Sequence, residues 1–305
     1  MRFLEKFSTS IFNLLPQNLF SWWKKGSRLL KLRDADSIGN VLKRGVALID
    51  DVTRRECRAW LFSQQTLEGG FPDRGGKCDL YYTLFGFFLA EAFDMEIVLN
   101  RLKTYVKTIV RQRNHEGTDL FCLAILHASL FPGDPETGRF VKKIRNLTGK
   151  SATQENGYQR FLVILSLMYL RDFASVLREL KSVGKGVTGI GKPCPVVAAQ
   201  GILDFIKSGL AQADAEPIMT YYRENGGFAA FSDTPGPDLL STSVALFALQ
   251  LKGYDLRFIR PDCMTFINGL YYQGGFRAAL QDTEVDVEYT FYGLLALGAI
   301  KRPSK

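Results

Sequence analysis

The chain has 305 residues, 46% of them hydrophobic, and its 39 Lys and Arg against 31 Asp and Glu give a net charge of +8. This composition supplies a large hydrophobic core, enough for one large domain or two small ones. The basic residues are spread along the whole chain, which argues against nucleic-acid binding and leaves a mildly basic surface able to attract phosphates or anionic lipid.

The cysteines and histidines exclude two further classes of protein. The five cysteines lie far apart, without a Cys-x-x-Cys pair, and the only two histidines are His115 and His127. An odd number of scattered cysteines argues against a secreted disulfide framework, so a reducing cytoplasm fits best. None of these residues has the spacing of zinc ligands.

The first 39 residues are interpreted as an N-terminal arm, and residues 40–305 as a single domain. Glu5 and Lys6 interrupt the apolar run too early for a signal peptide or a membrane span. Apolar residues beside the Trp-Trp-Lys-Lys cluster at residues 22–25 suit a peripheral membrane contact. The alternative is an arm that packs on the domain.

Three segments of the chain repeat one pattern: Gly-Gly-Phe, a loop, an aspartate, and a helix rich in Leu, Ala and aromatic residues. Three further apolar helices, without the glycine signature, lie between the first and second copies. The units recur roughly every 40 residues, which is typical of helical repeat proteins. The residues at which the six apolar helices begin are predicted to be Asp79, Asp119, Tyr158, Pro195, Asp238 and Asp286.

A more amphipathic helix precedes each apolar helix. A helix with one charged face borders water, whereas a helix that is apolar nearly all round is buried. The six pairs form either an open solenoid or a closed ring, and closure is favoured because the first and last units match each other best. No strand is predicted, and residues 183–193 are interpreted as a connection or a mobile lid. The six amphipathic helices are predicted at residues 40–65, 95–111, 136–148, 172–183, 213–223 and 256–272.

Two sequence motifs resemble those of known families. QTLEGGF, which ends at Phe71, resembles the Gln-x-x-x-Gly-x-Trp repeat of squalene and hopene cyclases. GGFPDRGGKCDLYYTLFG is similar to the GGF-x-DR-x-G-x-x-x-D-x-x-HTLFG segment of protein prenyltransferase β subunits. Together with the six-unit period, the chain resembles the terpenoid cyclase and protein prenyltransferase superfamily. That resemblance implies an all-α fold, an α/α toroid formed by a closed double barrel of about six helical hairpins.

The prenyltransferase resemblance implies a zinc ion held by an aspartate, a cysteine two residues further on, and a histidine. The matching positions hold Asp238, Leu240 and, at the two candidate histidine positions, Tyr82 and Tyr289. Two of three ligands are therefore missing, and zinc activation of a thiol is not expected. No cofactor is expected, and a need for magnesium is left open. The resemblance also implies a possible α-subunit-like partner or a homodimer.

A diphosphate leaving group would require a cluster of basic side chains. The candidates near the predicted starts of the apolar helices are Arg74, Lys77, Arg160, Lys192 and Arg277. Leu120 stands near the position where the family pattern expects an arginine. The sequence does not show whether the five basic residues converge.

The cyclase resemblance implies a different chemistry, in which the middle acid of an Asp-x-Asp-Asp-Thr run protonates an alkene or an epoxide. Alignment on Thr290 places Asp286 first and Glu288 at the middle position. A buried carboxyl group retains its proton and can act as a general acid. The structural alternative is that Asp79, Asp238 and Asp286 cap helices, while the helix dipole favours Glu288 in a first turn.

The leading functional expectation is a protein that binds an isoprenoid or similar apolar chain in a central cavity and acts on it as a zinc-independent prenyltransferase-like or cyclase-like enzyme. One alternative is a non-catalytic lipid-binding or scaffolding toroid. A third is a carbohydrate-active α/α barrel that uses Asp286 and Glu288 as a carboxylate pair. Aromatic residues on the predicted inner helices either line the pocket and stabilise a carbocation or form ordinary core: Tyr81, Tyr82, Phe85, Phe121, Tyr289 and Tyr292.

Overall fold

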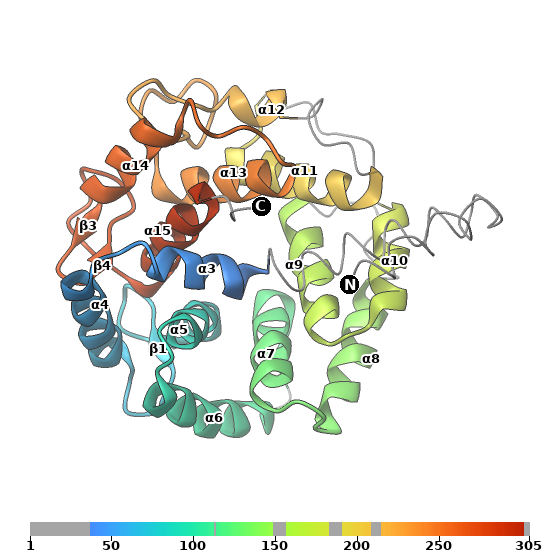
Figure 1. Ribbon diagram of the computed structural model, residues 1–305. Helices are drawn as coiled ribbons and strands as arrows, with labels where there is room; N and C mark the ends of the chain where they lie inside the picture. The colour runs from blue at the N-terminus through green and yellow to red at the C-terminus, as the bar shows by residue number, and fades with distance from the viewer. Residues whose placement is uncertain (1–36, 113, 149–156, 183–190, 209–214, 302–305) are drawn as a thin grey trace, which may run out of the picture.

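The computed structural model describes residues 37–112, 114–148, 157–182, 191–208 and 215–301. Six inner helices stand in a ring in chain order, and the last packs against the first, so the ring is closed (Figure 1). The predicted all-α, closed toroid is therefore confirmed. The inner helices are α5 (Leu80–Ala92), α7 (Gly117–Leu130), α9 (Gly157–Tyr169), α11 (Cys194–Ser208), α13 (Leu239–Leu251) and α15 (Val287–Ile300).

An outer helix precedes each inner helix and packs on the outside of the ring (Figure 1). The division between the layers follows the sequence pattern. Helix α4 buries only Cys57 and Leu61, whereas almost every residue of α15 is buried. The outer helices are α4 (Asp51–Gln64), α6 (Glu96–Val110), α8 (Glu136–Thr148), α10 (Phe173–Ser182), α12 (Glu216–Met219) and α14 (Arg260–Gly269).

The Gly-Gly-Phe segments form tight reversals, and the Phe of each pairs with the aspartate before the inner helix. Phe71 pairs with Asp79 in the short hairpin of β1 (Phe71–Pro72) and β2 (Cys78–Asp79). Phe228 pairs with Asp238 in the same way. Gly69 has a φ of 99°, a left-handed conformation that glycine adopts without strain.

The phenylalanine of these segments is a wedge between a hairpin and its inner helix. Phe71 and Phe276 are almost completely buried. A Cβ at Gly86 would lie 2.2 Å from the Phe71 ring, and one at Gly293 would lie 2.5 Å from the Phe276 ring. The glycines in the inner helices therefore provide the space that the rings fill.

The prediction of one helix over residues 40–65 was wrong. The segment forms two helices, α3 (Ile38–Val46) and α4, separated by a turn, because Asp50 caps α4 through the N–H groups of Val52 and Thr53. Helix α3 is not part of the outer layer: it begins at the centre of the ring and runs outward toward α4, packed against α15 and α5 (Figure 1).

Two glycines allow α3 to cross α15 at very short range. A Cβ at Gly45 would lie 2.0 Å from the carbonyl oxygen of Leu294, and a Cβ at Gly298 would lie 1.8 Å from that of Val41. Any larger residue would separate the two helices. Helix α3 is thus packed tightly onto the inner ring, with its N-terminal residue, Ile38, at the centre.

The predicted helix boundaries needed three further corrections. Residues 213–223 and 256–272, each predicted as one helix, contain the shorter helices α12 and α14. No strand was predicted, but strand β3 (Tyr271–Tyr272) pairs with β4 (Gly275–Phe276). Helix α7 begins at Gly117, so Asp119 lies in its first turn and does not cap it. Most of the predicted connection at residues 183–193, namely 183–190, lies outside the described residues.

Candidate functional site

The centre of the ring contains an apolar cavity of about 360 Å³, which we call the main chamber. All six inner helices contribute to its wall, together with Ile38 of α3. Its volume lies within the range of small-molecule sites in proteins. The lining residues are Ile38, Tyr81, Leu84, Phe85, Phe88, Cys122, Phe161, Leu162, Leu165, Pro195, Ala199, Ile202, Leu240, Val244, Phe247, Phe291, Tyr292 and Leu295.

The main chamber has two different ends. Tyr81, Pro195 and Leu240 each occupy the second position of an inner helix, so one end lies at the helix N-termini. We call this the polar end, because capping aspartates precede α5, α13 and α15 there. Phe88 and Phe247 lie about two turns further along α5 and α13, at what we call the apolar end.

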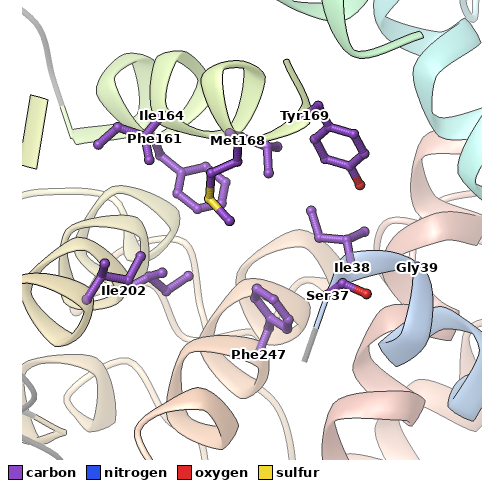
Figure 2. A pocket seen from close by; sticks show the side chains of 11 residues that line it. Ser37, Ile38, Gly39, Phe161, Ile164, Met168, Tyr169, Ile202 and Phe247 are labelled. Atoms are coloured by element: carbon purple, nitrogen blue, oxygen red, sulfur yellow. The ribbon is translucent and has the colours of Figure 1, made fainter. Parts of the chain in front are cut away.

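A second cavity of about 260 Å³ adjoins the apolar end, and we call it the side chamber. The two chambers share lining residues, among them Ile38, Ile202 and Phe247. Figure 2 shows apolar side chains from α9, α11 and α13 pointing toward the start of α3. The two chambers therefore lie next to each other in the middle of the ring, and the walls of both are mainly apolar.

Three aspartates cap inner helices, as the structural alternative expected. Asp79 accepts a hydrogen bond from the Tyr82 N–H at 2.9 Å. Asp238 accepts one from Ser241 at 2.8 Å, and Asp286 accepts one from Tyr289 at 2.8 Å. The partial positive charge at these helix N-termini is thus already compensated by the protein's own carboxylates.

Asp286 has a second partner, Arg74, at the point where the first unit meets the last. The Arg74 Nε donates to Asp286 Oδ2 at 2.6 Å, and its Nη2 donates to Asp282 at 2.8 Å. One oxygen of Asp286 therefore caps α15 and the other accepts from Arg74. The ion pair between Arg74 and Asp286 therefore joins the first unit of the ring to the last.

Glu288 is in a different situation from Asp286, although it lies only two residues further along. It is half-buried, and its Oε1 accepts a hydrogen bond from the Tyr81 hydroxyl at 2.9 Å. Burial raises the pKa of Glu288 to about 6. Glu288 is outside the set of residues that line the main chamber, and it is joined to the chamber wall by its hydrogen bond with Tyr81.

The six predicted aromatic residues separate into two groups. Tyr81, Phe85 and Tyr292 line the main chamber, and the Phe85 ring centroid lies 4.7 Å from that of Tyr81 and 5.5 Å from that of Tyr292. The other three are outside the lining set: Tyr82, Phe121 and Tyr289. The Arg74 guanidinium lies over the Tyr289 ring, 5.2 Å from its centroid.

The predicted basic residues do not meet at the main chamber. None of the described residues that line it is basic. Arg74 is engaged by the carboxylates at the ring closure, and Arg277 stacks on Tyr272 at 4.0 Å. Lys77 and Lys192 are exposed, and Arg160 is half-buried on α9.

Comparison with known proteins agrees with this geometry. The chain matches the family model of the Prenyltransferase alpha-alpha toroid domain over residues 18–118 and 196–304, which is more than half of its length. The chain belongs to this toroid family. Among the curated proteins and the solved structures, none matches it.

The zinc ion implied by the prenyltransferase branch of the toroid family does not fit the side chains present here. One oxygen of Asp238 is buried without a hydrogen-bond partner among the described residues, but Leu240 carries no ligand atom. Burial raises the pKa of Tyr289 to about 12, so it offers no phenolate at neutral pH. In the described part of the chain, no group of three His, Cys, Asp or Glu side chains could hold a metal.

The toroid family match begins inside the N-terminal arm, but residues 1–36, including the Trp-Trp-Lys-Lys cluster, lie outside the described residues. Across the residues that the structure does describe, no helix combines the length and apolarity needed to cross a bilayer.

A threonine in each glycine-bearing unit has a role that the sequence analysis did not assign. The Thr83 hydroxyl accepts a hydrogen bond from the Phe71 N–H at 3.0 Å. Thr242 does the same for Phe228 at 2.8 Å, and Thr290 for Phe276 at 3.1 Å. The constant Asp-x-x-x-Thr spacing was the available signal: the aspartate caps the helix and the threonine holds the hairpin.

Proposed function

We propose that the main chamber binds an isoprenoid or a similar apolar chain, and that the protein acts on this chain without zinc. The observation that carries the proposal is an apolar cavity, walled by all six inner helices, which has at its polar end the Tyr81 side chain hydrogen-bonded to Glu288. Transfer of a hydrocarbon chain from water into such a cavity is favourable. The toroid family match supports a prenyltransferase-like or cyclase-like protein at this coarser level.

The acid chemistry that we propose uses Glu288 through Tyr81. With a pKa of about 6, roughly a tenth of Glu288 is protonated at pH 7. The Tyr81 hydroxyl would give its proton to a carbon of a double bond and take the proton of Glu288. The products are a carboxylate at Glu288, a neutral Tyr81 and a cation on the chain. The ring faces of Phe85 and Tyr292 would stabilise that cation.

Charge favours the cyclase-like form of the proposal over diphosphate transfer. A diphosphate requires free cationic groups at the site. Here the guanidinium of Arg74 is held by Asp282 and Asp286, and the helix N-termini are capped by carboxylates. The carboxylates at the polar end would repel a diphosphate, whereas an uncharged polyene, alcohol or epoxide is not repelled by them.

A non-catalytic lipid-binding toroid is the second candidate function. It is favoured by the commitment of both Asp286 oxygens to structural partners and by the position of Glu288 outside the set of residues that line the main chamber. In this case the apolar chain is held and not converted.

Incubation of the purified protein with uncharged polyenes tests the two candidates. Squalene, its 2,3-epoxide and geranylgeraniol would be supplied below their solubility limits, and products identified by gas chromatography and mass spectrometry. The catalytic proposal expects a product from the wild type and a loss of at least a hundredfold in Glu288→Gln, which is typical of removing a general acid. Binding without any product would select the lipid-binding function, and an absence of binding would defeat both.

A further inference from the structure

The polar end of the main chamber has a negative balance of charge. Glu288 and Asp286 lie two residues apart at the start of α15, and Asp79 and Asp238 cap the neighbouring helices. The guanidinium of Arg74 faces this end, but Asp282 and Asp286 already neutralise it.

The proximity of the carboxylates is visible in their effect on the tyrosines. Burial, followed by the nearby negative charges of Glu288 and Asp286, raises the pKa of Tyr289 to about 12. The same causes in the same order raise the pKa of Tyr82. These carboxylates therefore act on one small region beside the cavity.

Aromatic faces accompany this charge. Tyr81 and Tyr292 line the main chamber, and Tyr82 and Tyr289 lie beside them, with ring centroids 6.1 Å from Tyr81 and 6.3 Å from Tyr292 respectively. One cation is already attracted to the group, because Arg74 lies over Tyr289. Aromatic ring faces attract ammonium groups, and a nearby negative charge adds to that attraction.

Glu288 is the one of these four carboxylates that caps no helix. Asp79 and Asp238 cap helices, and Asp286 is shared between a cap and Arg74. Glu288 accepts a hydrogen bond from Tyr81, a residue of the chamber wall, and its half-buried position costs the ionised form part of its hydration. A cation at the polar end would offset that cost.

We propose that the main chamber recognises amphiphiles with an apolar body and a cationic head, the ammonium lying at the polar end against the ring faces of Tyr81 and Tyr292 and attracted by the negative charge of Glu288, which is hydrogen-bonded to Tyr81. The inference rests on the proposed function in one respect, namely that the chamber holds an apolar chain. It adds a class of ligand, long-chain amines, and a selectivity in which a cationic head is preferred to a neutral head and an anionic head is disfavoured.

Three probes with the same chain and different heads test this selectivity: farnesylamine, farnesol and farnesyl diphosphate. Their affinities for the full-length protein would be measured by isothermal titration calorimetry at pH 7.5, below the aggregation limit of each probe. Glu288 is mostly ionised at this pH and the amine is protonated. We expect the amine to bind at least tenfold more tightly than farnesol, and the diphosphate at least tenfold more weakly.

Two matched variants locate the selectivity. Glu288→Gln keeps the shape of the side chain and removes its charge, and we expect the amine-to-alcohol preference to fall to within about threefold of unity. Glu284→Gln removes an equal charge from an exposed side chain four residues earlier, and we expect the preference to survive. Circular dichroism would verify that both variants fold.

The outcomes separate this inference from the proposed function. If farnesol and the amine bind equally to the wild type, if the preference persists in Glu288→Gln, or if the diphosphate binds most tightly, the inference is overturned while the chamber remains a site for apolar chains. If none of the three probes binds, the proposed function fails together with the inference.

Discussion

The two ends of the main chamber differ in what holds them together. The polar end is built from ionic and hydrogen-bonded groups that join residues far apart in sequence, such as Arg74 with Asp286 and Tyr81 with Glu288. The apolar end is built from packed side chains such as Phe88 and Phe247. In the proposed function, the apolar end would supply affinity for a chain, and the polar end would determine which head group or reaction is accepted.

The largest effect is expected at the hairpin that supports the polar end. Phe276→Ala would empty the space between β4 and Gly293 and destabilise the protein by about 3–5 kcal/mol. Urea unfolding followed by circular dichroism measures this change. Leu280→Ala, at a side chain that is 59% exposed, is the control and should stay within about 0.5 kcal/mol of the wild type. Equal losses in both variants would contradict the wedge role of Phe276.

Filling the chamber is the next test. Ala199 lines the wall beside Ile202, so Ala199→Trp would place an indole in the cavity and weaken farnesol binding at least a hundredfold, or about 2.7 kcal/mol. Val52→Trp adds the same ring to an exposed position on α4 and should leave binding unchanged. A folded Ala199→Trp protein that binds farnesol normally would show that the chain binds elsewhere.

Removal of a hairpin hydrogen bond should have a smaller effect. Thr242→Val keeps the shape of the side chain but leaves the buried Phe228 N–H without its acceptor, which costs about 1–3 kcal/mol. Thr265→Val removes an exposed hydroxyl on α14 and should cost less than 0.5 kcal/mol. Similar unfolding curves for both variants would contradict the inference that the Thr242 hydroxyl stabilises the hairpin through the Phe228 N–H.

The pH dependence of stability isolates Glu288. Burial raises the pKa of Glu288 from an ordinary value of 4.5 to about 6, and the negative charge of Asp286 adds to the rise. Tyr81, Tyr82 and Arg74 act in the opposite direction and lower this pKa. The folded state then binds more protons than the unfolded state between these values. Stability should fall by about 1–2 kcal/mol as pH increases through this window. Glu288→Gln should lack that component, and parallel profiles for the two proteins would contradict the assignment.

The sequence was sufficient for the ring because the repeated pattern carries local information. Gly69 and Phe71 mark a reversal, Asp79 marks a helix start, and the apolar helices identify the inner layer. The path of α3 was missed because residues 40–65 have one continuous helical pattern. Only the close approach permitted by Gly45 and Gly298 brings α3 to the centre.

The candidate site was only partly accessible from sequence. Glu288 was singled out by its alignment on Thr290, but its bond to Tyr81 joins residues more than 200 positions apart and follows from ring closure. The chamber residues on α9 and α11, such as Phe161 and Ile202, belong to units without a distinctive motif. They could be assigned to an inner helix, but not to a cavity wall.

Photocrosslinking tests the central claim, that the main chamber is where an apolar chain binds, most directly. A farnesol analogue with a diazirine at the end of its chain would be bound, irradiated and mapped by peptide mass spectrometry, with excess farnesol as competitor. We expect competed crosslinks to residues of α9, α11 and α13 at the apolar end, among them Phe161, Ile202 and Phe247. Crosslinks confined to the outer helices, or insensitive to competition, would contradict this claim.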